Sequence, residues 1–168
     1  MIKIQEDLKA YFEANPVTNF KKLAKLQSWD LVHDSFETTS FYVEGTWKNY
    51  LYSLLWIEKD QQLKLTCEYN LKLPKENNNL FYKSINLANE KCSDGYFTFC
   101  ENHHVLIFHN QYKGSDALEI ESRRTKEIII ETTAKMDEVY PVFQLISCGK
   151  ESHDMALSFA SNHTSGFI

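Results

Sequence analysis

This 168-residue sequence contains few of the residues on which most catalytic and cofactor sites depend. Its five glycines leave little material for a phosphate-binding loop, and neither GxSxG nor GxxxxGK[ST] occurs. Its four cysteines include no CxxC pair, which favours buried free thiols in a reducing compartment over a disulfide framework. The sequence therefore predicts no cofactor and no catalytic nucleophile.

Two further absences limit the partners. The net charge of -5 and the pI near 5.7 show no basic excess of the kind that nucleic-acid binding requires. No stretch approaches 18 uncharged apolar residues, and Met1 to Asp7 lacks the apolar segment of a signal peptide. We therefore predict a cytoplasmic protein that binds neither nucleic acid nor membrane.

The sequence is rich in aromatic residues, with 11 Phe, 9 Tyr and 3 Trp. At this length one domain can bury a substantial core, and 43% hydrophobic residues suit a globular chain. Asn15-Pro16 ends the first amphipathic stretch. We predict a helical extension over 1–15, a single α+β domain over 16–160 and a tail over 161–168.

Alternating side chains predict an antiparallel sheet. The clearest strand is Leu63–Lys72, in which apolar and polar residues alternate strictly, so that one face is buried and the other solvated. Asn49–Glu58 differs because both of its faces are apolar, which is typical of a central strand or of one that receives a partner. The predicted strands are 30–34, 40–44, 49–58, 63–72, 96–101 and 104–112.

Helical periodicity separates and follows these strands. Helices are predicted from Thr18 or Asn19 to Trp29, from Asn77–Asn79 to about Cys92, and over a short final segment, 152–159. A long helix carries a predicted buried stripe of Ile129, Thr133, Met136, Tyr140 and Phe143. Pro141 lies inside it and predicts a bend or a break. The fold class is thus an antiparallel sheet with helices on one face, in the order α-β(3-4)-α-β(2)-α.

The order of elements and several short strings resemble the YbjN-like bacterial family, whose fold is similar to that of type III secretion chaperones. The strings are Leu63-Lys64-Leu65-Thr66-Cys67 with Leu71-Lys72-Leu73-Pro74, Gly95-Tyr96-Phe97-Thr98-Phe99, and Tyr140-Pro141-Val142-Phe143-Gln144. The resemblance runs from about Pro16 to Ala160, and it departs at Cys148, Lys150 and His153, where the family has Trp, Gly and Pro. It implies a regulator of sensory transduction that binds protein. It supplies no functional residues.

One hairpin gathers residue types that bind zinc: Cys100, Glu101, His103, His104 and His109. Their spacing argues against a site, because His104 and His109 differ by an odd number and would point to opposite faces of a strand. We therefore predict no metal. A metal-dependent or thiol enzyme that uses the 100–109 hairpin is kept as an alternative.

Aromatic side chains on the sheet carry the leading functional hypothesis. We expect six of them to lie on the side away from the helices and to form a protein interface: Tyr50, Tyr52, Trp56, Phe97, Phe99 and Phe108. The competing interpretation is that the long helix and the N-terminal segment cover them completely. The sequence then predicts a non-enzymatic module that forms a homodimer and binds an unidentified protein client. A sensor for a small ligand held between sheet and long helix is the remaining alternative.

Overall fold

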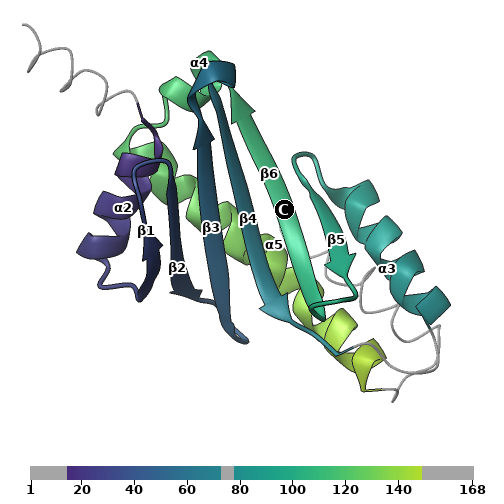
Figure 1. Cartoon of the computed structure of the whole chain (residues 1–168). Coiled ribbons are helices and arrows are strands. Elements are labelled where there is room, and N and C mark those ends of the chain that lie inside the picture. Colours follow the sequence, from purple (N-terminus) through teal and green to yellow (C-terminus); the bar gives the residue numbers. More distant parts are fainter. Residues whose placement is uncertain (1–14, 73–77, 149–168) are drawn as a thin grey trace, which may run out of the picture.

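The computed structural model describes residues 15–72 and 78–148, which form a six-stranded antiparallel sheet with helices on one face (Figure 1). The predicted fold class is therefore confirmed. The helices are α2 (Val17–Leu26), α3 (Asn78–Lys91), α4 (Ser115–Leu118) and α5 (Ser122–Ser147), with a 3-10 turn, η1 (Glu58–Asp60). The strands are β1 (Leu31–Asp34), β2 (Thr38–Glu44), β3 (Asn49–Ile57), β4 (Gln62–Asn70), β5 (Tyr96–Cys100) and β6 (Val105–Lys113). The helices predicted within 1–15 and 152–159 fall almost wholly or wholly outside the described residues.

The strand order is β1-β2-β3-β4-β6-β5. The first four strands form a meander because short turns connect them, and such turns join antiparallel neighbours. α3 then carries the chain past β4, so that the β5–β6 hairpin adds with β6 beside β4 and β5 at the edge. Asn89 of α3 ties that edge to the helix, since its side chain donates to the carbonyl oxygen of Phe97 (3.1 Å) and accepts from the Phe97 amide (2.6 Å).

The core lies between the sheet and α5, which crosses behind the strands in Figure 1. Alternate residues of β3 and β4 point into it, in agreement with the predicted period of two. From α5, the predicted stripe residues Ile129, Met136 and Phe143 are buried, whereas Thr133 and Tyr140 are half-buried. The remaining buried residues of α5 are Thr125, Ile128, Thr132 and Ile146.

Pro141 does not interrupt α5, so the predicted break is wrong. Proline has no amide hydrogen, so it leaves the carbonyl oxygen of Asp137, four residues earlier, without its helical partner. The indole Nε1 of Trp47, in the turn between β2 and β3, donates to that oxygen at 3.1 Å. Trp47 also stacks on Tyr140, with ring centroids 6.4 Å apart. The turn therefore supplies the hydrogen bond that the proline removes.

α2 is shorter than predicted and begins one residue earlier. The side-chain oxygen of Asn15 accepts the Val17 amide at 3.0 Å, so Asn15 rather than Thr18 or Asn19 satisfies a free amide at the helix start. The same side chain donates to the carbonyl of Phe36 at 2.8 Å. The helix ends at Leu26 because Ser28 has a φ of 55°, which helical backbone does not tolerate.

Candidate functional site

The six aromatic residues predicted to form an exposed interface lie on the opposite side of the sheet from the one we expected. Five of them are buried beneath the helices, and Phe99 is half-buried against Phe81 of α3, with ring centroids 4.8 Å apart. Tyr52 is fixed there by its hydroxyl, which contacts Thr133 Oγ1 of α5 at 2.8 Å. The expected location is therefore wrong, and these residues belong to the core of the monomer.

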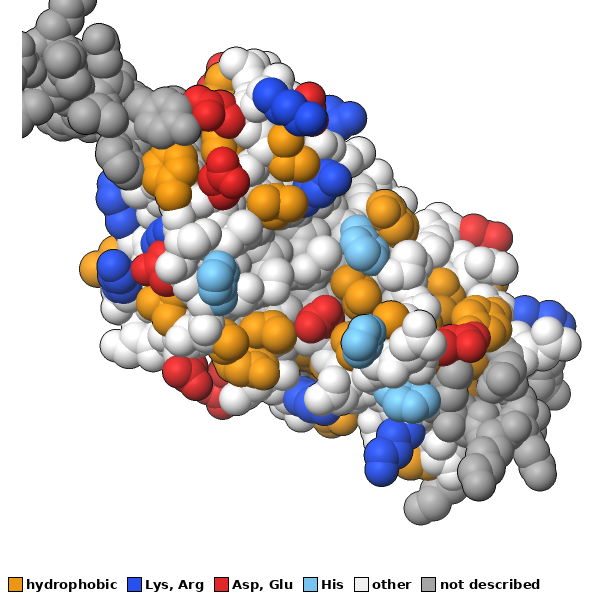
Figure 2. Space-filling view, viewed as in Figure 1, with side chains coloured by type: hydrophobic (Ala, Val, Ile, Leu, Met, Phe, Trp, Pro, Cys, Tyr) orange, Lys and Arg blue, Asp and Glu red, His pale blue; other side chains and the backbone are white. Residues whose placement is uncertain are grey.

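The face of the sheet opposite α5, called here the open face, is covered by no described helix. Figure 2 looks onto it and shows hydrophobic side chains around a middle of mostly polar, uncharged ones. Its largest exposed apolar groups are Tyr42, Leu55 and Tyr96, with exposed fractions of 39%, 37% and 52%. The side chains that form it were assigned to the right strands but to no functional site.

A continuous row of side chains crosses the middle of this face. The strand register places the following residues side by side, from β1 to β5, and we call them the central row: His33, Ser40, Ser53, Thr66, His109 and Tyr96. The three residues at its centre are small. Longer side chains in the neighbouring rows border these small residues on both sides.

Two further rows border the central row. The Glu68 row contains Tyr42, Leu51, Glu68, Ile107 and Thr98. The Lys64 row contains Thr38, Leu55, Lys64 and Gln111. Each row thus combines apolar side chains on β2, β3 or β6 with one charged residue on β4.

Four side chains of the central row, those of His33, Ser40, Ser53 and His109, already have hydrogen-bond partners within the chain. Ser40 Oγ contacts Ser53 Oγ at 2.9 Å, and His109 Nε2 contacts Thr98 Oγ1 at 2.8 Å. The His109 ring also stacks on Tyr96, with centroids 4.9 Å apart. A partner could cover these groups at little cost, because burying a polar group is expensive mainly when it lacks a hydrogen bond.

The two charges of the open face on β4 have no ion-pair partner among the described residues. Lys64 is exposed and Glu68 is half-buried. Burial raises the pKa of Glu68, and the nearby His103 opposes that shift without cancelling it. Thr66 separates the two residues along the strand, so they lie about 13 Å apart and cannot pair within one chain.

The hairpin that carries zinc-binding residue types brings them together poorly. Within residues 15–72 and 78–148, no group of three or more His, Cys, Asp and Glu side chains could hold a metal ion. Glu101 accepts a hydrogen bond from the Tyr82 hydroxyl, and His109 points along the open face to Thr98. Cys67 is buried in the core, and this burial raises the pKa of its thiol, so it is not a reactive thiolate at neutral pH.

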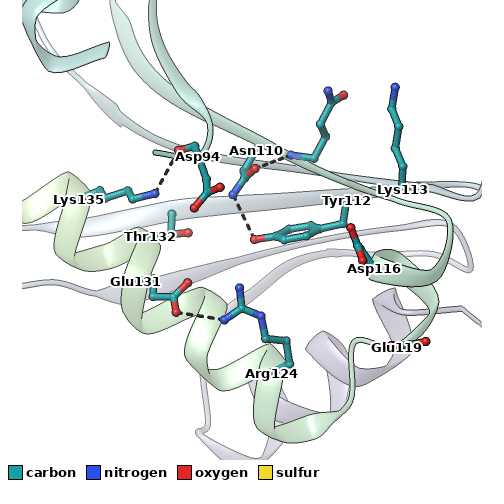
Figure 3. Close-up of a pocket in the computed structure, with 11 residues that line it drawn as sticks. Asp94, Asn110, Tyr112, Lys113, Asp116, Glu119, Arg124, Glu131, Thr132 and Lys135 are labelled. Carbon is teal, nitrogen blue, oxygen red and sulfur yellow. Dashed lines mark hydrogen bonds and ion pairs between the residues drawn. The ribbon is translucent and has the colours of Figure 1, made fainter. Parts of the chain in front are cut away.

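A polar cleft of about 630 Å³ lies between β6 and α5, next to the start of β5 (Figure 3). Asn110 and Tyr112 line it from β6, Asp94 from the segment before β5, and Arg124 and Lys135 from α5. Asn110 Nδ2 donates to the Tyr112 hydroxyl at 3.1 Å, and burial raises the pKa of that hydroxyl to about 12. The sequence suggested a ligand held between the sheet and the long helix, but it did not identify these residues, because they are scattered from position 94 to 135.

The charges in this cleft are largely neutralised by their neighbours. Arg124 Nη1 pairs with Glu131 at 3.1 Å and with Glu127 at 3.4 Å, and Lys135 Nζ donates to the carbonyl of Asp94 at 3.1 Å. Burial works to lower the pKa of Arg124, but the hydrogen bond and charge of Glu131 outweigh it and raise that pKa. The cleft therefore offers both donors and acceptors, without a strong excess of either charge.

A smaller, apolar groove of about 350 Å³ lies between α2 and α5. Most of its apolar wall is formed by five side chains: Leu23 of α2, Trp29, Val43 of β2, and Ile129 and Ile130 of α5. Nothing in the described residues indicates which partner fills it.

We compared the chain with curated proteins, solved structures and protein families. No curated protein matches it. A chain in the solved structure of the HopA1–SchA chaperone–effector complex is similar to it, with a TM-score of 0.47 and 12% sequence identity. That similarity covers 76% of this chain and 96% of the other. Among the described residues, no helix is long and apolar enough to cross a membrane.

A family model matches residues 17–112, which is more than half of the 168 residues. The matched segment extends from the start of α2 to Tyr112 near the end of β6, so it contains nearly all of the sheet and of the open face. The chain belongs to this family, YbjN, whose description is "Putative bacterial sensory transduction regulator".

Proposed function

We propose that this chain is a non-catalytic protein-binding module that acts in the cytoplasm as a homodimer, through the open face of its sheet, and regulates sensory transduction. The open face itself is the observation that carries the proposal. It is broad, partly apolar and uncovered by any described helix, and exposed apolar patches of this kind mark interaction sites. The family description supports the regulatory role.

The chemistry of the open face supports a protein partner. Tyr42 and Tyr96 are exposed aromatic side chains at its two sides, and tyrosine is enriched among the residues that anchor interfaces. Between them, Ser40 bonds to Ser53 and Thr98 bonds to His109, so covering these four side chains leaves these bonds in place. The four cysteines are free thiols, which supports a reducing compartment.

The oligomeric state tests this proposal directly. We expect size-exclusion chromatography with light scattering to give twice the mass of one chain at micromolar concentration. Leu55→Asp, in the middle of the open face, should produce a folded monomer. Leu26→Asp is the matched control because Leu26 is exposed at the end of α2, away from this face, and it should remain dimeric.

The protein client is the second part of the proposal. Affinity capture at endogenous level should recover a client with the wild-type chain and with Leu26→Asp. A client that is lost with Leu55→Asp binds the open face or requires the dimer, whereas a client that is retained binds elsewhere. Failure to recover any reproducible client would contradict this part of the proposal.

The polar cleft supports a second candidate function, a sensor of small polar ligands. Its hydroxyl, amide, carboxylate and guanidinium groups converge on a volume of about 630 Å³, which is the size of a small-molecule site. A thermal-shift panel of amino acids, sugars and nucleotides tests this. A ligand that raises the melting temperature of the wild type but not of Arg124→Gln supports a sensor, and the absence of any such ligand contradicts it.

A further inference from the structure

We propose that the homodimer is a two-fold, face-to-face sandwich whose symmetry axis runs along the central row, so that Glu68 of each copy pairs with the partner's Lys64. This inference rests on the proposed homodimer and specifies its geometry. It depends on the pattern of side chains on the open face. In one orientation of two copies, the charged and apolar side chains of one face match those of the other.

Only an axis that lies in the plane of the interface can bring two identical sheet faces together. There are two simple directions for it, along the strands or across them. Rotation about an axis across the strands, along the central row, places each strand opposite the same strand of the partner. It also places the Glu68 row of one copy opposite the Lys64 row of the other. Glu68 then faces the partner's Lys64, because both lie on β4 at equal distances from Thr66.

The apolar residues match in the same orientation. Leu51 and Leu55 lie on β3, two residues to either side of Ser53, so Leu51 faces the partner's Leu55. An axis along the strands, between β3 and β4, gives the opposite result. Because Leu51 is the register neighbour of Glu68, and Leu55 that of Lys64, that axis would bury each charge against a leucine. Charge complementarity therefore selects the axis across the strands.

The small side chains of the central row permit close approach along the axis. Packed sheets lie about 10 Å apart, and their strand directions differ by about 30°, which a small tilt of the axis accommodates. Ser40, Ser53 and Thr66 would meet their own copies, while the longer residues of the bordering rows interdigitate on both sides. Ser40 and Ser53 already bond to each other through their hydroxyls, so covering this pair leaves neither unpaired.

The size of the face is sufficient for a stable dimer. The six strands contain 43 residues, and each residue covers about 16 Å² of the sheet plane. The resulting footprint is about 680 Å², within the range of about 600–1,000 Å² per partner in interfaces of standard size.

Glu68 provides independent support. It is half-buried and has no ion-pair partner among the described residues, and the charge of nearby His103 offsets only part of the effect of burial in the monomer. The partner's Lys64 supplies the missing charge. Since the symmetry creates this pair twice, reversing one charge alters two contacts at once.

A charge swap tests the pairing. We expect Lys64→Glu and Glu68→Lys each to weaken dimerisation about tenfold or more, because each places like charges opposite one another twice. The double variant Lys64→Glu/Glu68→Lys restores opposite charges and should return the dissociation constant to within about threefold of wild type. Lys59→Glu is the matched control. It changes the net charge equally but lies in η1, off the open face, and should have no effect.

Sedimentation equilibrium of the four variants distinguishes the two proposals, with far-UV circular dichroism to establish that each is folded. A wild-type monomer at high micromolar concentration overturns both the homodimer and its geometry, and assigns the open face to another protein or to the chain's own ends. A dimer that neither single reversal weakens leaves the homodimer standing and overturns the sandwich. Single reversals that the double variant fails to rescue overturn the pairing while retaining the face as the interface.

Discussion

Asp137 connects three groups that lie about ninety residues away in the sequence. Its carboxylate accepts the Tyr50 hydroxyl at 2.6 Å and the Thr46 amide at 2.9 and 3.0 Å, and its carbonyl accepts the Trp47 indole. This one residue therefore fastens the β2–β3 turn to α5. Burial and the hydrogen bond to Asp137 both raise the pKa of Tyr50 far above its usual range, so Tyr50 remains a donor at any ordinary pH.

We expect Asp137→Ala to destabilise the protein by about 2 kcal/mol, because it leaves a largely buried hydroxyl and an amide without their acceptor. Asp137→Asn retains one side-chain oxygen and should cost less. Urea denaturation monitored by tryptophan fluorescence measures both. Equal losses for the two variants would contradict a role based on hydrogen-bond acceptance.

Glu68 should show its lack of a partner in the pH dependence of the monomer. Its pKa is raised in the folded chain, so the protonated form favours folding. That contribution is present below the unfolded pKa and is lost as the pH rises through the folded value. We therefore expect Glu68→Gln to increase the free energy of unfolding of the monomer at pH 7, with a difference that shrinks toward pH 4.

Urea denaturation at a protein concentration well below the dimer dissociation constant measures this difference. The sign should reverse for the dimer, where Glu68 faces the partner's Lys64 and the Glu68→Gln substitution would remove the ion pair. A Glu68→Gln variant that is less stable than the wild type as a monomer at pH 7 would contradict the assignment.

At the scale of elements, α5 shows how a proline can occupy the middle of a long helix. The position of Pro141 in the sequence is enough to show that the Asp137 carbonyl loses its helical hydrogen bond. The sequence could not identify Trp47 as the replacement donor, because that contact joins residues 90 positions apart. Local rules therefore predicted a defect that the tertiary structure repairs.

A double-mutant cycle tests this repair. Trp47→Phe keeps an aromatic ring at this position but removes the indole donor, and we expect it to cost about 1 kcal/mol. Pro141→Ala restores an amide hydrogen that can reach the Asp137 carbonyl within the helix. In the Pro141→Ala background, Trp47→Phe should therefore cost clearly less, as measured by urea denaturation. Additive costs would mean that the indole does not compensate for the proline.

The strands show where prediction from sequence succeeds. Strict alternation in Leu63–Lys72 predicted a strand, and β4 covers Gln62–Asn70. Apolar character on both sides of Asn49–Glu58 left two interpretations, a central strand or a strand that receives a partner. β3 lies between β2 and β4, and its Leu51 and Leu55 lie on the open face. Strand boundaries agree within one or two residues, because the turn residues that end each strand are visible locally.

At the scale of the whole molecule, the two faces of the sheet differ in what covers them. The aromatic face packs on α5, and the face rich in hydroxyl groups stays open. The pairing of β2 with β3 shows this difference. Phe41 and Tyr52 are register neighbours inside the core, whereas Tyr42 and Leu51 are register neighbours on the open face.

We expect Tyr52→Asp to unfold the protein, since an unpaired charge at a fully buried site costs at least about 3 kcal/mol. Tyr42→Asp lies on the open face and should leave the monomer folded, with a loss below about 1 kcal/mol. Far-UV circular dichroism and urea denaturation measure both. If Tyr52→Asp remained as stable as Tyr42→Asp, the assignment of the two faces would be wrong.

The sequence by itself determined the elements, their order and the division of each strand into two sets of side chains. In β3 it could not determine which set the helices cover, because both sets contain apolar residues there. Tyr50, Tyr52 and Trp56 were therefore identified as a structural group but assigned to the wrong side. Their size and apolar character suit the space under α5 better than the serine and threonine residues opposite them.

Only the tertiary structure decided the composition of the open face. The central row combines residues from all six strands, and their alignment depends on the register of five strand pairs, which turns and core packing set together. The spacing of Lys64 and Glu68 on one strand is visible in the sequence. That they border a row of small hydroxyls, opposite leucines on the next strand, follows from the folded sheet, because hydrogen bonding between strands places distant residues side by side.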